Sequence, residues 1–412
     1  MKHKIYEIRS EFYRTDRRAP LALYQPKEDS PNKQIAVIAM HGMDYMSFPP
    51  VIELAKRGFI AIGSNPAFFS RDIRSKMLDV KSVVDFVKAY PGVKKVILMG
   101  HSGGGSMLSC YQYIAECGAA RFQTTDRIIP FPEIEPLTPA DGMILIDNNY
   151  GIMPVLAMDP AVKTLDNGFQ RIPELDIYSP ENGYDPEGSH YTEEFKRAFQ
   201  KAQINFYRSV LAYAQERYEI IKAGKGRFCD DEPLVIPGAA GNSDFNKLFL
   251  QDTSLLNHTR GEHTILHKNG ETSKEIAYTV RPPKRAPNPE SLRGALNTTV
   301  LSFLSEEFRF EDDFGYDECS MWGGDWDFIK DSTRANVKGI KVPTLVEGNT
   351  GSHEFIQAEY IYENSASADK DLFFLEGADH NFMSLDEEKY GDTLAALADY
   401  LTAWLTQEGR FI

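Results

Sequence analysis

The chain of 412 residues lacks several features that would each point to a particular class of protein. It contains no run of about 18 apolar residues, so we expect no transmembrane helix. Its N-terminal stretch, MKHKIYEIRSEFYRTDRR, is too polar for a secretory signal peptide, and we expect a cytoplasmic protein. Only four cysteines are present. They are widely spread and form no CxxC pair, which favours reduced thiols over disulfides.

Basic residues are also fewer than acidic ones. There are 45 Lys and Arg against 60 Asp and Glu, which gives a net charge of −15. This acidic balance argues against nucleic acid or an anionic membrane as the main partner. Apolar residues make up 42% and charged residues 25%, as in an ordinary globular protein. We therefore expect a partner of another kind, a small-molecule substrate.

Strand-like and helix-like segments alternate in the first third of the chain and again near its end. Continuous apolar runs separated by amphipathic helices indicate a mostly parallel sheet covered by helices on both faces, which is an α/β fold. The expected strands are 34–42, 59–65, 94–100, 141–149, 342–348 and 370–376, and the expected helices are 49–58, 79–90, 106–118 and 390–406.

The alternation is absent from residues 151–335. That segment contains a long, aromatic-rich amphipathic helix over 191–224 and two strands joined at the Asn269-Gly270 turn. We therefore expect a core built from 1–150 and 336–412, and a large, mainly helical cap or lid formed by the insertion 151–335.

One short motif suggests chemistry. Gly100-His101-Ser102-Gly103-Gly104 fits G-x-S-x-G and lies between an expected strand and an expected helix. A sharp turn at this point lifts the serine oxygen clear of the sheet, and it requires small neighbours. We interpret Ser102 as a nucleophile. At the x position, the side chain of His101 should point away from Ser102 and pack or hydrogen-bond beneath the turn.

A serine nucleophile needs a base, and the base needs a carboxylate. His380, directly after the last expected strand, is the candidate base. For the acid we rank Glu354 first, because it lies in the loop after the penultimate strand. Asp147, at the end of an earlier strand, ranks second, and Glu347 ranks third.

Acyl transfer also needs two N–H donors for the oxyanion. The backbone N–H of Gly103, directly after the nucleophile, is the first candidate. The second is the N–H of Met43, which follows His41-Gly42 at the end of an early strand.

In this order, the segments MHGMD, GHSGG, VPTLVEG and EGADHNF resemble the oxyanion loop, nucleophile, acid and histidine segments of the α/β-hydrolase family. The resemblance covers about residues 30–150 and 338–412. It implies the α/β-hydrolase fold and an insertion after the sixth strand that caps the active site. One departure concerns the acid loop, where Gly351 stands roughly at the aspartate of the usual Gly-x-x-Asp.

Serine chemistry with an oxyanion site predicts a carboxylesterase or lactonase that acts without a cofactor. A large cap favours a bulky, partly apolar substrate, of which a macrocyclic lactone such as a macrolide is one instance. Trp322 and Trp326 are candidate substrate contacts. Hydrolysis of a carbon–carbon bond in a diketone is an alternative, as is a non-catalytic binding protein on the same fold.

We expect no metal site. His258, His263 and His267 lie close together in the sequence, but their spacing fits no standard zinc pattern.

Overall fold

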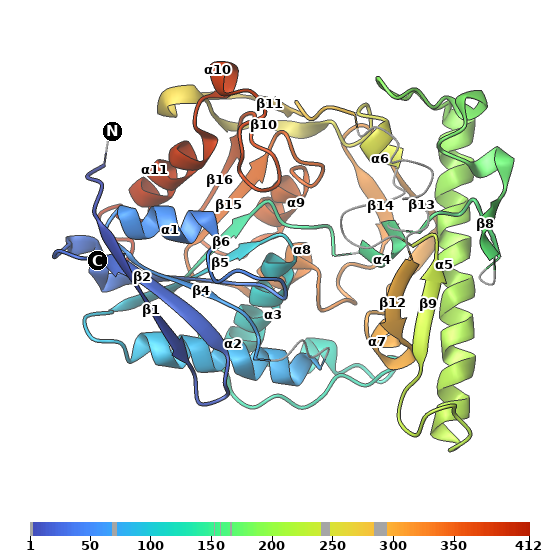
Figure 1. Ribbon diagram of the computed structural model, residues 1–412, viewed down its shortest axis with the longest axis horizontal. Coiled ribbons are helices and arrows are strands. Elements are labelled where there is room, and N and C mark those ends of the chain that lie inside the picture. The colour runs from blue at the N-terminus through green and yellow to red at the C-terminus, as the bar shows by residue number, and fades with distance from the viewer. Residues whose placement is uncertain are drawn as a thin grey trace.

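A ten-stranded sheet forms the centre of the protein (Figure 1). The computed structural model describes residues 3–67, 72–151, 153–156, 158–164, 167–239, 248–283 and 295–412. In spatial order, the strands of the sheet are β1 (Ile8–Arg14), β2 (Pro20–Pro26), β4 (Ile60–Ser64), β3 (Ile35–Met40), β5 (Lys95–His101), β6 (Gly142–Ile146), β15 (Thr344–Asn349), β16 (Lys370–Leu375), β10 (His258–Leu266) and β11 (Thr272–Tyr278).

Helices cover both faces of this sheet. Helices α1 (Pro49–Lys56) and α11 (Thr393–Leu405) pack on one face, and α2 (Ile73–Lys88), α3 (Gly103–Cys117) and α9 (Gln357–Asn364) pack on the other. Successive strand residues alternate between the two faces, so Val37 joins one apolar cluster and Ile38 the other. Because both faces are buried, the strands are continuously apolar, as the sequence indicates.

The strand directions define the fold. β4, β3, β5, β6, β15 and β16 all run parallel to one another, whereas β2 runs antiparallel to β1 and β4. The order β1-β2-β4-β3-β5-β6-β15-β16 with an antiparallel second strand is that of an α/β-hydrolase fold. The protein therefore has the α/β-hydrolase fold that its sequence predicts.

The segment between β6 and β15 is mixed in structure rather than mainly helical. Three two-stranded sheets, β7-β8, β12-β9 and β13-β14, accompany its helices. Its elements outside the central sheet are α4 (Met153–Leu156), β7 (Val162–Thr164), β8 (Asn167–Arg171), α5 (Glu193–Lys222), β9 (Pro233–Pro237), α6 (Leu248–Gln251), β12 (Ala295–Thr299), α7 (Val300–Ser305), β13 (Phe310–Tyr316) and β14 (Met321–Gly324). Helix α8 (Thr333–Asn336) also lies in this segment, and α10 (Glu387–Tyr390) precedes α11, which completes the described α-helices.

The long helix α5 matches the sequence-based expectation. Its N-cap residue Thr192 accepts a hydrogen bond from the Phe195 N–H, and Gly224 adopts a positive φ of 69° just past its end. It stands at the end of the molecule far from both termini (Figure 1). Phe199 and Tyr207 on its inner face are buried. The Tyr207 hydroxyl accepts a hydrogen bond of 2.8 Å from the Phe308 N–H, which ties α5 to the segment before β13.

Part of the expected cap belongs to the core. The hairpin β10-β11 extends the central sheet, because β10 pairs in parallel with β16 through Thr264, Ile265 and Leu266. The expected Asn-Gly turn joins the two strands, and Asn269 has the positive φ of 65° that such a turn requires. Assigning all of 151–335 to a cap is therefore wrong for the hairpin, since the pairing of β10 with a strand a hundred residues away leaves no local sequence signal.

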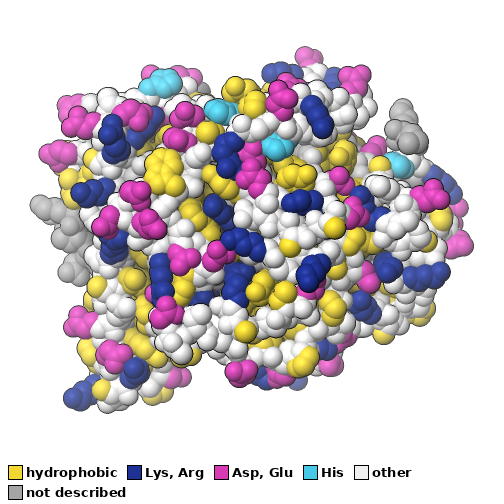
Figure 2. All heavy atoms as spheres, turned by 180° about the vertical axis from the view of Figure 1, so that it is seen from behind, with side chains coloured by type: hydrophobic (Ala, Val, Ile, Leu, Met, Phe, Trp, Pro, Cys, Tyr) yellow, Lys and Arg dark blue, Asp and Glu magenta, His cyan; other side chains and the backbone are white. Residues whose placement is uncertain are grey.

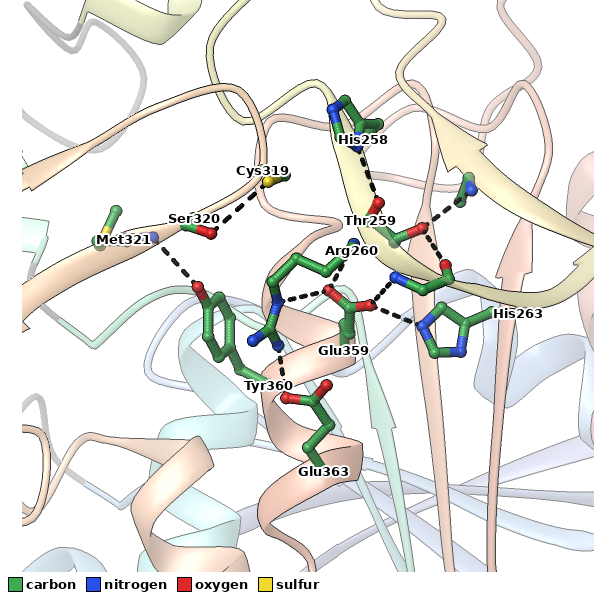
Figure 3. Close-up of polar contacts among 12 residues, drawn as sticks. His258, Thr259, Arg260, His263, Cys319, Ser320, Met321, Glu359, Tyr360 and Glu363 are labelled. Atoms are coloured by element: carbon green, nitrogen blue, oxygen red, sulfur yellow. Dashed lines mark hydrogen bonds and ion pairs between the residues drawn. The ribbon is translucent and has the colours of Figure 1, made fainter.

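A buried carboxylate anchors this hairpin to α9. β10 bulges between His258 and Glu262, which leaves the N–H groups of Arg260 and Gly261 without partners on β11. Both N–H groups donate to Glu359, at 3.0 and 2.9 Å. Figure 3 shows the same carboxylate between the side chains of Arg260 and His263, which donate at 3.1 and 2.8 Å. Glu359 thus replaces the missing ladder bonds.

The surface carries both signs of charge. On the face shown in Figure 2, basic side chains are interspersed with acidic ones. Among the described helices, none combines the length and the apolar character that crossing a membrane would need.

Candidate active site

Ser102 occupies a strained turn between β5 and α3. It is the single residue between the end of the strand and the start of the helix, and its φ of 52° with ψ of −129° is unusual for a residue with a side chain. A Cβ on Gly100 would lie 2.5 Å from the Gly105 Cα, and a Cβ on Gly104 would lie 2.7 Å from the Met40 carbonyl oxygen. These glycines allow the helix to begin almost in contact with the sheet.

His380 lies in the loop after β16, and Asp147 directly follows β6. The Nδ1 of His380 donates to Oδ2 of Asp147 at 2.5 Å, while Oδ1 of Asp147 accepts from the Asn349 N–H at 3.2 Å. Asp147 is completely buried. Because Nδ1 carries the shared proton, the Nε2 of a neutral His380 is left as a base. Nε2 makes no hydrogen bond with any described residue.

The surroundings of His380 favour its charged form. Burial alone would lower its pKa, but the hydrogen bond to Asp147 and the negative charges of Asp147 and Glu354 outweigh burial and raise the pKa of His380 to about 9. The ring therefore binds a proton far more readily than an isolated histidine, as a base in an acyl-transfer site must do once it has taken a proton.

Glu354 is a second acid beside the same ring nitrogen. Its Oε2 lies 3.7 Å from Nδ1 of His380, beyond hydrogen-bond range, and its side chain is 2% exposed. Asp147 is therefore closer to His380 than Glu354 is, whereas the sequence-based ranking places Glu354 first. Glu347 differs from both, because burial and the charge of Asp147 raise its pKa well above the usual value and keep it protonated. Neither of its carboxyl oxygens has a hydrogen-bond partner among the described residues.

His101 links the nucleophile turn to the histidine loop. Its Nε2 bonds the carbonyl oxygen of His380 at 2.8 Å, and since a carbonyl only accepts, Nε2 must carry the proton. Its Nδ1 then accepts from the Tyr45 hydroxyl. Burial first, and the positive charge of His380 second, lower the pKa of His101 well below normal, so the ring is neutral. As expected from the sequence, this side chain packs and hydrogen-bonds beneath the turn.

The structure does not join Ser102 directly to His380. The Ser102 hydroxyl makes no hydrogen bond within the described part of the chain. His101 precedes Ser102 in the chain, and its ring centroid lies 4.6 Å from that of His380, so His101 connects the two residues. Hydrogen bonds of this kind are often long in a substrate-free site and tighten when substrate binds.

The two expected oxyanion donors differ in availability. Gly103 is the first residue of α3, so its N–H points out of the helix without an intrahelical partner. The N–H of Met43 instead donates to Nδ1 of His41 at 2.8 Å, and the Met43 side chain is 57% exposed. The loop turns back on itself at this point, so the Met43 N–H, the second expected oxyanion donor, already has a partner two residues earlier in the same loop.

A cavity of about 350 Å³ opens beside Gly103. Core residues such as His41 and Asn149 line it together with Tyr207 and Phe308 from the insertion. A second cavity of about 600 Å³ shares four lining residues with the first, and apolar side chains such as Phe131 and Leu301 line much of it. The shared residues are Ile73, Arg127, Ser305 and Lys330.

Neither of the expected tryptophan contacts lines these two cavities. The Trp322 indole N–H donates to the Asp313 carbonyl at 2.7 Å, and the side chain lies on the surface of the β13-β14 hairpin. Trp326 is buried beneath the Arg334 guanidinium, 3.8 Å away, and packs edge-on against Phe308. That these two residues contact substrate therefore remains a prediction, and neither of the two cavities near Gly103 supports it.

The three clustered histidines, two in β10 and His267 just after it, have protein partners. His258 bonds the Thr259 carbonyl, His263 bonds Glu359, and both nitrogens of His267 bond Glu376 and Ser273. Donor atoms of His101, Asp147 and His380 lie within 4.8 Å of one another. A metal ion there would have to displace a hydrogen bond of His101, because both of its ring nitrogens have partners. In the described part of the chain, these three residues hydrogen-bond to protein groups, so we interpret them as a hydrogen-bond network rather than as metal ligands.

Two residues at the site were not assigned roles from the sequence. Asn148 donates to the Gly100 carbonyl at 2.9 Å, and Asn149 points into the cavity beside Gly103. Their position directly after Asp147 is the only sequence signal, because side chains that follow the end of a parallel strand gather at the edge where ligands bind.

No protein-family model matches the chain, and no curated protein matches it. Among solved structures, it is similar to a hypothetical protein, PA2218, from Pseudomonas aeruginosa, with 14% identity, 97% of this chain and 94% of that chain covered, and a TM-score of 0.44. Est1E from Butyrivibrio proteoclasticus is 9% identical over 96% of this chain and 97% of its own, with a TM-score of 0.40. The α/β hydrolase GrgF from Penicillium sp. sh18 is 10% identical over 98% and 99%, with a TM-score of 0.42. Likeness at this level carries no inference about activity, and the fold assignment rests on the strand order.

Proposed function

We propose that the protein is a serine hydrolase that cleaves an ester bond in a bulky, partly apolar small molecule. The observation that supports this most is the hydrogen bond of 2.5 Å between His380 and the buried Asp147, at the edge of the sheet where Ser102 occupies a strained turn. A nucleophile, a base oriented by a carboxylate and a free N–H group at a helix start are the parts that acyl transfer requires.

In the acylation step, Oγ of Ser102 attacks the carbonyl carbon of the ester and gives its proton to Nε2 of His380. The carbonyl π electrons move to oxygen, and the oxyanion faces the N–H of Gly103. When the tetrahedral intermediate collapses, the bond to the alcohol oxygen breaks and His380 returns the proton to that oxygen. Asp147 stabilises the imidazolium while it exists.

Deacylation repeats the sequence with water. His380 takes a proton from a water molecule, the resulting hydroxide oxygen bonds to the acyl carbon, and a second oxyanion forms. Collapse breaks the bond to Oγ, His380 protonates Ser102, and the carboxylic acid leaves. A lactone would follow the same steps, except that its alcohol stays attached to its acyl chain.

The cavities support a substrate larger than a short acyl ester. The volumes of about 350 and 600 Å³ fall in the range typical of small-molecule sites. Because the insertion supplies Tyr207 and Phe308 to the first cavity, part of the wall of this cavity is aromatic. A macrocyclic lactone such as a macrolide is one substrate of suitable size and mixed polarity.

A fluorophosphonate probe tests the proposal. We expect it to phosphonylate wild-type protein, with the adduct located on the peptide containing Ser102 by mass spectrometry, and to leave Ser102→Ala unlabelled. Ser109→Ala is the matched control, because Ser109 lies on the same helix but is completely buried and hydrogen-bonds to the Ser106 carbonyl. Equal labelling of wild type and Ser102→Ala would contradict the proposal. An unlabelled wild type that still binds a bulky lactone would favour a non-catalytic binding protein.

A further inference from the structure

The ring of His41 lies against the residue that follows the nucleophile. A Cβ on Gly103 would lie only 3.1 Å from Nε2 of His41, and a Cβ on Gly104 would lie 3.2 Å from Cδ2 of the same ring. The ring stacks on Tyr45 with centroids 4.6 Å apart and planes inclined by 12°. The His41 carbonyl also accepts a hydrogen bond of 2.9 Å from Asn65. His41 is therefore held in place over the start of α3.

The partners of His41 decide which of its nitrogens carries the proton. The Met43 N–H donates to Nδ1 at 2.8 Å, so Nδ1 must present its lone pair. Burial first, and the nearby charge of His380 second, lower the pKa of His41 to about 4, so the ring is neutral at pH 7. A neutral ring whose Nδ1 accepts must carry its proton on Nε2. This N–H faces Gly103 and has no partner among the described residues.

Asn149 presents a second donor to the same place. Its Oδ1 accepts from the Gly151 N–H at 3.1 Å and from the Ser106 hydroxyl at 3.0 Å. A backbone N–H can only donate, so the atom facing Gly151 must be the oxygen, and the amide nitrogen is turned the other way. That nitrogen would lie 3.4 Å from a Cβ on Gly103 and makes no hydrogen bond within the described chain.

We propose that the Nε2–H of His41 and the amide of Asn149 complete the oxyanion site with the N–H of Gly103. This inference rests on the proposed hydrolase function. The Met43 N–H is then a positioning group, since it fixes the tautomer of His41 rather than contacting the substrate. The arrangement also explains why a glycine follows the nucleophile: a side chain at position 103 would fill the space in which both donors meet.

The donors are fixed before the substrate arrives, which is the condition for strong stabilisation of a developing charge. Removing one oxyanion donor typically lowers kcat by about 10²–10³-fold. Because an oxyanion forms only in the transition state, the loss should appear in kcat while KM changes little.

His41→Phe and His41→Gln form the principal test, with a 4-nitrophenyl ester as substrate. Phe keeps the stacking on Tyr45 but has no N–H, and we expect kcat/KM to fall by about 10²–10³-fold. Gln restores an amide N–H near Nε2, and we expect it to recover at least about tenfold over His41→Phe. Affinity for a trifluoromethyl ketone, which adds to the serine and presents an oxyanion, should fall in parallel with kcat/KM.

Asn149→Asp provides a second, independent variant. The aspartate retains both acceptor contacts but replaces the donor with a carboxylate oxygen, so we expect at least about a 10²-fold loss in kcat with the melting temperature kept. His190→Phe is the control for loss of an imidazole, at a histidine in the insertion whose backbone N–H donates to the Gly183 carbonyl and would be kept in the variant.

The outcomes separate this inference from the proposed function. Wild-type protein that the fluorophosphonate does not label would overturn the hydrolase proposal itself. Labelled wild type with His41→Phe within about threefold of its kcat/KM would overturn only the oxyanion role, and would return that role to the Met43 N–H. Equal losses in His41→Phe and His41→Gln, accompanied by a lower melting temperature, would assign His41 a structural role and likewise overturn the inference.

Discussion

The choice between Asp147 and Glu354 can be decided by the pH dependence of the two variants Asp147→Asn and Glu354→Gln. His380 must be neutral to accept the proton of Ser102, so kcat/KM should rise with pH until the ring is deprotonated. With the pKa of His380 raised to about 9, we expect the wild-type profile to rise across the neutral range and level off near that value.

The magnitude follows from the same interactions. The increase in the pKa of His380 from the ordinary 6.5 to about 9 corresponds to about 3.5 kcal/mol of added stabilisation of the charged ring, at about 1.4 kcal/mol for each pKa unit. The hydrogen bond of 2.5 Å belongs to Asp147, whereas Glu354 at 3.7 Å acts only through its charge. In Asp147→Asn the effect of burial remains, and the midpoint should fall to or below the ordinary pKa of histidine.

The expected rates differ as well. Asp147→Asn removes the acceptor that fixes the tautomer of His380, and losses of about 10³–10⁴-fold in kcat are typical of such a change. For Glu354→Gln we expect a loss below about tenfold and a midpoint between those of wild type and Asp147→Asn. The assay is kcat/KM for a 4-nitrophenyl ester from about pH 5 to about pH 10. If Glu354→Gln abolished turnover while Asp147→Asn retained it, the assignment from distance would be refuted.

Unfolding experiments provide an independent check. Because the pKa of His380 is higher in the folded than in the unfolded state, its contribution to stability is complete below pH 6.5 and is lost as the pH rises through about 9. The free energy of unfolding of wild type should therefore decline over this range by up to about 3.5 kcal/mol more than that of Asp147→Asn. Equal declines in urea titrations of the two proteins would contradict the proposed pairing.

Three further predictions concern single contacts. Gly103→Ala should lower kcat/KM by more than about tenfold and shift the melting temperature by only a few degrees, because its Cβ would meet Nε2 of His41 at 3.1 Å. Because the pKa of Glu347 is raised, the folded protein keeps a proton that the unfolded chain releases above about pH 4.5, and wild type should lose stability as the pH rises. Glu347→Gln should lose less stability over the same pH range. If the free energy of unfolding from urea titrations fell with pH as steeply in Glu347→Gln as in wild type, this prediction would be contradicted. Glu359→Gln should destabilise the protein by about 2 kcal/mol, since hydrogen bonds to a charged group are worth about 1.5–3 kcal/mol, and an unchanged midpoint of urea unfolding would refute the anchoring of β10.

Local patterns in the sequence predicted the frame of the fold well. Strands such as β3 and β5 are continuously apolar because both sheet faces are covered, and that signal is visible without knowing which strands are neighbours. The nucleophile turn is equally local, since a strand end, a strained residue and close helix packing all act within Gly100–Gly105. The long helix α5 and the Asn269-Gly270 turn were predicted for the same reason.

Features that depend on distant pairing were not predicted. Nothing in the sequence of β10 indicates that it adds to the edge of β16, so the hairpin was assigned to the cap. The order of the two acids is a similar case. β6 and β15 are adjacent parallel strands, with Ile146 opposite Glu347, so the loops that follow both strands converge on His380. Which carboxylate makes the shorter contact depends on loop geometry rather than on position in the chain.

The three histidines of the site differ in proton affinity because their partners differ. Of the three rings, only His380 is hydrogen-bonded to a carboxylate, and its pKa is raised to about 9, whereas burial and the charge of His380 lower the pKa of His41 to about 4 and that of His101 well below normal. In the proposed mechanism, a proton taken from Ser102 therefore stays on His380 instead of passing to the two neighbouring rings. His101 and His41 remain neutral and donate from Nε2, one to the His380 loop and one, by our inference, to the oxyanion. A carboxylate hydrogen-bonded to either ring would raise the proton affinity of that ring and move the positive charge away from the base, so this division of roles requires the acids to pair with His380 alone.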